Sequence, residues 1–342
     1  MNIVFVTLAE ASLAAQIGIP TFIIGILGLV FGVLLAIASK VFAVEVDPRV
    51  EEINEILPGA NCGGCGNPGC SGYADAIVNK GEAINKCSPG GADVVAQIAK
   101  IMGQEVTEVQ KNVAFIHCSS GGLKTTNWRY QYQGVFSCKS AVNLAGGPNA
   151  CEWGCVGFND CVNACLFEAI HVDEDGMRHI DIEKCTGCGA CVAACPRKLI
   201  SLHPIDQNVQ INCSSKAKGP DAKAACGSQH SCIGCGICAK KCPAGAITII
   251  DNLARIDDEK CINCGICATA CPTKAIFDPL AGRRKKAQIS ADLCIGCTLC
   301  TKQCPVKAIS GELKQTHTVN TELCVGCELC LGRCPKKAIT MV

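Results

Sequence analysis

The pattern of hydrophobic and polar positions changes along the chain. Residues 17–38 (IGIPTFIIGILGLVFGVLLAIA) carry no charge, and their length matches one membrane-spanning helix. Residues 47–59 put apolar side chains on one face of a short amphipathic helix that ends at Pro-Gly, and residues 92–112 predict a helix followed by a polar connection. Farther on, short apolar segments such as GAITII and KAITMV predict short strands. The pattern therefore predicts an α+β chain behind an N-terminal helix.

The uncharged segment has two interpretations, a membrane anchor and a cleaved signal peptide. A signal peptide needs a basic region before its apolar core, but no Lys or Arg precedes Lys40, whereas the acidic Glu10 does. We therefore predict one transmembrane helix within residues 1–46. Lys40 and Arg49 follow the span, so the positive-inside rule places the rest of the chain on the cytoplasmic side of the cell membrane.

Cysteines recur behind the anchor at fixed spacings. The pattern C-x2-C-x2-C-x3-C-P occupies residues 185–196, 232–243, 261–272, 294–305 and 324–335. Three thiolates spaced in this way reach three corners of one 4Fe-4S cluster, and the fourth, just before Pro, ligates the cluster of the paired motif. Zinc and disulfides are the alternatives, but a zinc ribbon uses two C-x2-C pairs separated by a longer span. The apolar segment after each fourth cysteine predicts a short strand and one ferredoxin-type hairpin for each motif. We predict tandem two-cluster modules like those of bacterial ferredoxins.

Two cysteine groups depart from this spacing. Residues 62–87 contain C-x2-C-x4-C-x16-C, which predicts a small four-Cys 4Fe-4S domain, with zinc as the alternative. Residues 151–165 (CEWGCVGFNDCVNAC) contain C-x3-C-x5-C-x3-C, a loosened ferredoxin motif. The predicted domains are the anchor (1–46), the four-Cys domain (47–107), a ferredoxin-like module with extra cysteines (108–228), and two regular modules (229–282 and 283–342).

The crossover of each fourth cysteine predicts seven ligand sets. They are Cys62, Cys65, Cys70 and Cys87; Cys151, Cys155, Cys161 and Cys195; Cys185, Cys188, Cys191 and Cys165; Cys232, Cys235, Cys238 and Cys271; Cys261, Cys264, Cys267 and Cys242; Cys294, Cys297, Cys300 and Cys334; and Cys324, Cys327, Cys330 and Cys304. These sets leave four of the 32 cysteines: Cys118, Cys138, Cys213 and Cys226. Because AFIHCSS and VQINCSS repeat one context, we predict that the four share an eighth cluster. The alternative is four free buried thiols that pack as small hydrophobes.

Composition supports metal-bound thiolates in a reducing compartment. Of the 32 cysteines, 28 lie in ligand spacing, and aromatic residues are only 4% of the chain. Small modules cannot bury large cores, so clusters should contribute to folding. The sequence contains no P-loop, no G-x-G-x-x-G after a strand and no Ser-His-Asp order, so we expect no catalytic residue and no nucleotide or flavin site. The net charge of +1 does not indicate nucleic acid.

One basic segment stands out between the last two modules. Arg283, Arg284, Lys285 and Lys286 are consecutive. The segment is either a solvated linker or a docking patch for an acidic electron carrier, whose approach would be steered by charge.

The order of anchor, CGGCGNPGC and tandem ferredoxin motifs resembles the RnfB family, the iron-sulfur components of the Rnf complexes, which are membrane ferredoxin:NAD+ oxidoreductases that pump Na+ or H+. The resemblance covers nearly the whole chain, and the three motif pairs look like the long form found in anaerobes. It implies an electron-transfer subunit of a translocase that accepts electrons from soluble ferredoxin and passes them to other Rnf subunits, which carry the NAD site and the ion path. The alternatives are a membrane-tethered polyferredoxin that serves a hydrogenase or a redox-sensor reductase, and a zinc-binding protein, which would be colourless.

Overall fold

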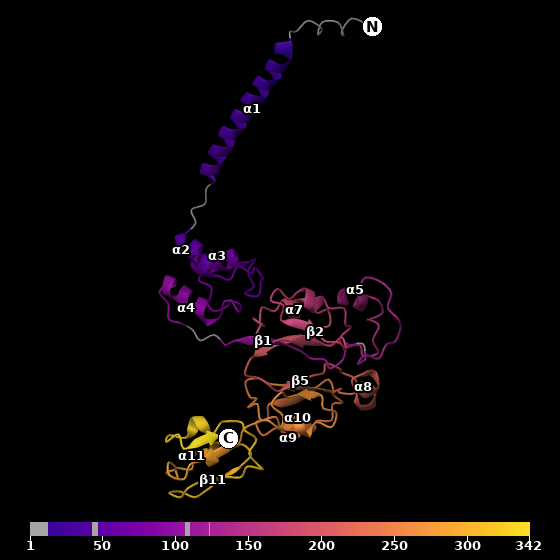
Figure 1. Ribbon diagram of the computed structural model, residues 1–342, viewed down its shortest axis with the longest axis vertical. Helices are drawn as coiled ribbons and strands as arrows, with labels where there is room; N and C mark the ends of the chain where they lie inside the picture. Colours follow the sequence, from indigo (N-terminus) through magenta and orange to yellow (C-terminus); the bar gives the residue numbers. More distant parts are fainter. Residues whose placement is uncertain (1–12, 43–46, 107–109, 123) are drawn as a thin grey trace. The chain divides into compact units, whose positions relative to one another are not determined.

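The computed structural model describes residues 13–42, 47–106, 110–122 and 124–342 (Figure 1). The chain forms two units, residues 1–51 and 52–342, and each is described by itself. Residues 1–12 and 43–46 of the predicted anchor lie outside the described residues, as does the predicted domain boundary at residue 107.

The first unit is dominated by one long helix, α1 (Leu13–Val41), with Pro20 in its N-terminal part. Large apolar side chains from Ile17 onward are exposed, which is unfavourable in water and suits a lipid environment. By length and composition, Ile17–Val41 is able to cross a membrane, as predicted.

The four-Cys domain folds around a small core of its own. It contains α2 (Pro48–Ile56), α3 (Cys70–Lys80) and α4 (Gly91–Met102). Ile53, Tyr73, Ile77, Val95 and Ile98 are fully buried between them. The Tyr73 hydroxyl donates to the carbonyl of Ala83 (2.8 Å) and accepts from the N–H of Lys86 (3.0 Å), so the ring stays buried while its polar end is satisfied.

Three modules with the same strand pattern follow. Each has one local antiparallel hairpin and one antiparallel pair between its first and last strands. The hairpins are β2 (Ile170–Val172) with β3 (Arg178–Ile180), β6 (Ile247–Ile250) with β7 (Leu253–Ile256), and β10 (Ile309–Ser310) with β11 (Thr318–Val319). The outer pairs are β1 (Asn112–Ile116) with β4 (Ile200–Pro204), β5 (Gln210–Ile211) with β8 (Ile276–Phe277), and β9 (Ala287–Ile289) with β12 (Ile339–Met341).

The predicted strand after each fourth cysteine is confirmed, but a hairpin for every motif is wrong. Only the first motif of each pair is followed by a hairpin, because the chain leaves the module after the second motif. That last strand pairs instead with the strand that opens the module. One consequence is that β5, at residues 210–211, belongs to the sheet of the second module, although the predicted boundary at residue 228 grouped these residues with the first.

Short helices begin near the third cysteine of each motif. They are α6 (Asp160–Asn163), α7 (Ala190–Ala194), α9 (Ile237–Lys241), α10 (Ile266–Ala270), α11 (Leu299–Gln303) and the 3-10 turn η1 (Leu331–Arg333). Two further helices, α5 (Cys138–Asn143) and α8 (Gly219–Ala225), lie outside this pattern. One begins at Cys138 and the other ends just before Cys226, so both adjoin cysteines outside the motifs.

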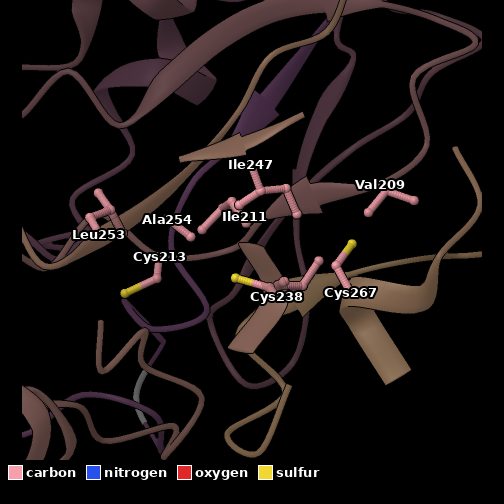
Figure 2. Packing of buried hydrophobic residues seen from close by; sticks show 9 residues of the cluster. Val209, Ile211, Cys213, Cys238, Ile247, Leu253, Ala254 and Cys267 are labelled. Carbon is pink, nitrogen blue, oxygen red and sulfur yellow. The ribbon is translucent and has the colours of Figure 1, made fainter. Parts of the chain in front are cut away.

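Each module has a small core in which cysteines pack among aliphatic side chains. In the second module, Cys213, Cys238 and Cys267 lie with residues such as Ile211 and Ile247 (Figure 2). The other two modules have equivalent clusters, built from Val113, Ile170 and Ile200 or from Ile309 and Ile339 together with motif cysteines. The cysteines therefore occupy the positions that large apolar residues hold in an ordinary core.

Candidate iron-sulfur centres

Three cavities are each lined by three cysteines of one motif and the fourth cysteine of its partner. The second motif of the first module shares its cavity with Cys165 from the preceding motif. The equivalent cavities of the second and third modules are lined by Cys232, Cys235, Cys238 and Cys271, and by Cys294, Cys297, Cys300 and Cys334. These are the crossover sets that the sequence predicts. Small and aliphatic residues form most of the remaining walls, together with Phe167 in the first cavity and with His317 and Lys336 in the third.

The same crossover brings together two more regular sets, and the cysteines of the four-Cys domain also lie close together. Burial, together with the nearby thiols of Cys264, Cys261 and Cys242, raises the pKa of Cys267 to about 12. Burial raises the pKa of Cys330 to about 11, with Cys327, Cys324 and Cys304 close enough to add to the shift. In the four-Cys domain, burial raises the pKa of Cys87, and so do Cys70, Cys62 and Cys65. Thiols crowded in this way become thiolates when a cation binds them.

The fourth cysteine of each motif accepts a backbone hydrogen bond that the sequence pattern did not indicate. The residue three positions later has a left-handed conformation, as in Lys274 (φ 52°), Lys307 (φ 51°) and Lys337 (φ 49°). This turns the next N–H toward the sulfur. The donors are Ala169, Leu199, Ala246, Ala275, Ala308 and Ala338, at 3.2–3.4 Å. Such N–H···S bonds stabilise a cluster-bound thiolate and raise the reduction potential of its cluster.

The spacing of the cysteines fits clusters better than single ions. Among the residues that the structure describes, no three His, Cys, Asp or Glu side chains lie close enough to hold one metal ion. A tetrahedral zinc with Zn–S bonds of ~2.3 Å would bring its sulfurs within ~4 Å of one another. A four-iron cube holds its ligands farther apart, so the cavities and their N–H donors fit 4Fe-4S clusters.

Comparisons with known proteins agree with this geometry. Residues 57–89 match the family model described as a putative Fe-S cluster. Residues 151–199, 184–246 and 231–275 match one 4Fe-4S dicluster domain model, and residues 254–309 and 287–341 match another.

Curated relatives share most of this organisation. The B subunit of the Na(+)-translocating ferredoxin:NAD(+) oxidoreductase complex of Acetobacterium woodii is 46% identical over 71% of this chain and 72% of its own length. The B subunit of the ion-translocating oxidoreductase complex of Methanosarcina acetivorans is 44% identical over 68% of this chain and 88% of its own length. The chain belongs to the RnfB family. It is an iron-sulfur electron-transfer subunit with multiple 4Fe-4S clusters, and the resemblance seen in the motifs is confirmed.

One ligand set of this RnfB chain differs from the prediction. The cavity of the first motif in the first module is lined by Cys138, Cys155, Cys161 and Cys195, whereas the sequence had placed Cys151 there. The Asp160 carboxylate fixes Cys138 in this position, because it accepts from the Cys138 N–H (2.9 Å) and the Ser137 hydroxyl (3.0 Å) at the start of α5. This arrangement differs from the predicted grouping of Cys138 with Cys118, Cys213 and Cys226.

Two arginines adjoin this irregular site, and neither was among the predicted site residues. Arg178 donates to the carbonyls of Gly121 (2.6 Å) and Gly157 and to the Asn159 side chain (2.8 Å). Arg197, directly after the Cys-Pro pair, donates to the Cys151 carbonyl (3.0 Å) and to the carbonyls of Gly154 and Gly146. The C-P-R sequence is a usable signal, since the other four regular motifs have Ala, Thr, Val or Lys after Pro.

The basic segment is not a four-residue docking patch. Arg284 forms a buried ion pair with Asp278, its Nη1 lying 2.6 Å from the carboxylate, and its Nε donates to the Asn263 carbonyl (3.1 Å). Lys286 donates to the carbonyl of Cys324. The Arg284 side chain therefore joins the second module to the third, whereas the Lys286 bond lies within the third. Of the four basic residues, Arg283 and Lys285 are exposed.

Proposed function

We propose that this chain accepts electrons from reduced ferredoxin and relays them through its clusters to membrane redox subunits of an ion-translocating ferredoxin:NAD+ oxidoreductase. The observation that carries the proposal is the series of crossover cysteine sets in apolar cavities, in a chain of the RnfB family. The relatives are named for Na+ in A. woodii and for protons in Clostridium ljungdahlii, whose subunit is 41% identical over 59% of this chain.

Bound 4Fe-4S clusters supply one-electron transfer, and the chain's residues set the conditions for it. Cysteine thiolates fix the position of each cluster. Backbone N–H groups donate to those sulfurs and stabilise the reduced state. Aliphatic walls such as Ile249 and Ala254 keep water away, which limits reorganisation during transfer. We assign seven clusters in this way, with Cys138 replacing Cys151 in the irregular set.

We place the other tasks of the complex in its partner subunits. The described part of the span, from Ile17, carries no acidic residue and no basic residue before Lys40, so it offers no path for an ion. We propose that α1 anchors the chain in the cell membrane and that the iron-sulfur modules lie on the cytoplasmic side, where reduced ferredoxin and NAD+ are found.

The relay is tested in the anaerobically purified complex by following ferredoxin oxidation together with NAD+ reduction. Replacing Cys65 and Cys70 with Ala should remove the cluster of the four-Cys domain and abolish NAD+ reduction, while ferredoxin still reduces other clusters, as seen by electron paramagnetic resonance. The variant Lys100→Ala, at an exposed position of α4 in the same domain, leaves every cysteine in place and serves as the control. NAD+ reduction at the wild-type rate without that cluster would refute the relay. Protease cleavage of the modules in inverted vesicles tests their sidedness.

A further inference from the structure

Cys151, which does not line the cavity of its own motif, lies near the isolated cysteines Cys118, Cys213 and Cys226. Burial raises the pKa of Cys151, and the nearby Cys226 thiol raises it further. The thiols of Cys155 and Cys151 likewise add to the effect of burial on the pKa of Cys118. Burial raises the pKa of Cys213 to about 11, with Cys232 and Cys151 contributing. Cys151 is therefore the common neighbour of Cys118, Cys213 and Cys226.

Hydrogen bonds between the segments hold these four cysteines in place. Ser119 and Ser228 share a hydroxyl hydrogen bond of 2.8 Å, which joins the Cys118 segment to the Cys226 segment. The Ser214 hydroxyl donates to the His117 carbonyl (3.0 Å), which joins the Cys213 segment to the same place. Arg197 holds the Cys151 carbonyl. The arrangement is fixed by contacts of residues next to each cysteine, not by the cysteines alone.

Three of the four sulfurs have hydrogen-bond donors close by, as the sulfurs of the regular sites do. Cys118 Sγ accepts from the backbone N–H groups of Cys155 (3.3 Å) and Ser120 (3.4 Å). Cys213 Sγ accepts from the N–H of Ser215 (3.4 Å), and Cys226 Sγ lies 3.2 Å from the Ser228 hydroxyl. Four free thiols packed as hydrophobes would not need this set of donors, whereas thiolate ligands do.

We propose that Cys118, Cys151, Cys213 and Cys226 hold an eighth 4Fe-4S cluster that bridges the first and second ferredoxin modules. The proposal rests on the proposed relay and gives it a path. The first module contributes Cys118 and Cys151, and the other two ligands come from segments that lead into the second module. We call this set the bridging site.

The bridging site touches the neighbouring cluster site on each side. Cys118 accepts from the backbone of Cys155, which belongs to the irregular site of the first module. Cys213 lies beside Cys232, a ligand of the second module. Without a cluster here, an electron would have to pass directly between these two modules.

Contacts elsewhere within residues 52–342 bring other neighbouring cluster sites close to one another. The thiols of Cys264 and Cys327 are close enough for Cys327 to raise the pKa of Cys264, which joins the second module to the third. At the other end, the backbone of Gly64 packs directly against the carbonyl of Cys188, which joins the four-Cys domain to the first module. The eight sites then form a single file from the C-terminal module to the four-Cys domain, with the bridging site inside it.

Iron and sulfide analysis of the full-length chain, purified anaerobically in its complex, tests the bridging site independently of activity. We expect about 32 irons per chain, against about 28 with seven clusters. Replacing Cys151 and Cys226 together with Ala should remove about four irons and leave the resonance signals of the other clusters unchanged. The matched control replaces Cys138 and Cys161, which should remove a different cluster and a different signal. No loss of iron from the Cys151/Cys226 variant would overturn the proposal.

A second measurement covers the case in which that variant folds poorly. The single variant Cys226→Ser keeps an oxygen ligand and should shift one resonance signal while about 32 irons remain. If no signal shifts, Cys226 is not a ligand and the proposal fails.

A third measurement tests electron flow across the bridging site. In the Cys151/Cys226 variant, rapid-freeze spectra after mixing with reduced ferredoxin should show the clusters on one side of the missing bridging cluster reduced and those on the other side still oxidised. Uniform reduction would overturn the bridging role, whereas failure of wild-type ferredoxin oxidation would overturn the relay itself.

Discussion

The third and first ferredoxin modules share one strand pattern but specify their ligands differently. In the third module, residues 287–341, the two regular motifs contain every ligand of both sites, and a short outer strand pair closes the module. In the first module, residues 112–204, the loosened motif contributes Cys155 and Cys161 while Cys138 arrives from a separate helix. In the regular motifs, two residues separate the first two cysteines, and both ligate the same cluster. In the loosened motif, three residues separate Cys151 from Cys155, and only Cys155 lines the cavity of that motif.

The difference has a structural cause in the Cys151–Cys155 loop. Arg197 binds the carbonyls of Cys151 and Gly154, so the loop is held with Cys151 directed toward Cys226. Asp160 then supports Cys138 in the vacated position. Cys151 of the first module therefore belongs to the bridging site, which the first module shares with the second, and not to the site of its own motif. Irregular spacing therefore marks a module that shares a site with its neighbour, whereas regular spacing marks a self-contained module.

Removal of the metal should have the largest effect and should affect the four-Cys domain and the third module unequally. The third module has few aliphatic core residues besides its cysteines, so chelation of iron under anaerobic conditions should unfold it. The four-Cys domain keeps Ile53, Tyr73 and Ile98 in a core of its own, so α3 and α4 should remain partly helical. Circular dichroism and hydrogen exchange by segment would show the contrast. Equal protection in both regions after chelation would contradict it.

Loss of the buried ion pair should separate the last two modules. Arg284→Ala leaves the Asp278 carboxylate, whose side chain is 2% exposed, without its partner, and this should cost about 3–5 kcal/mol. The neighbouring exposed variant Arg283→Ala is the matched control and should cost almost nothing. The rate at which denaturant bleaches the visible absorbance measures the effect. Equal rates in the two variants would mean that the pair does not hold the modules together.

Gly64 is a sharper probe of the contact between the four-Cys domain and the first module. A Cβ atom on Gly64 would collide with the backbone carbonyl of Cys188, so Gly64→Ala should cost about 1–3 kcal/mol or displace the domain. Gly332→Ala is the control, because no atom lies within 4 Å of its Cβ position. Hydrogen exchange around Cys188 should rise in the first variant only. Unchanged exchange would show that the two sites are not in contact.

The sequence predicts local ligand sets and strands well because both depend on residues close in the chain. The regular motifs indicate the crossover sets, and the apolar segments after Cys242 and Cys334 indicate β6 and β12. It does not predict that Cys138 replaces Cys151, because this depends on Asp160 and Arg197, whose partners lie farther away. Neither interpretation of the basic segment included the burial of Arg284, because this depends on its pairing with Asp278 in the tertiary structure.

The smallest effect should be a change in the reduction potentials of the clusters next to Arg197 in the first module. Burial lowers the pKa of Arg197, while the neighbouring thiols of Cys151, Cys155 and Cys118 oppose this shift, and a guanidinium stays charged in either case. The charge therefore lies beside the irregular site and the bridging site. A nearby cation stabilises an added electron. Arg197→Met should therefore make the potentials of these two clusters more negative. Lys336→Met, at the equivalent position of the third module, should have a smaller effect, because Lys336 borders one cluster cavity but is exposed to solvent. Redox titration followed by electron paramagnetic resonance measures both variants. Arg197→Lys should recover part of the potential because it keeps the charge, and equal potentials in the Met and Lys variants would show that Arg197 acts only by holding the loop.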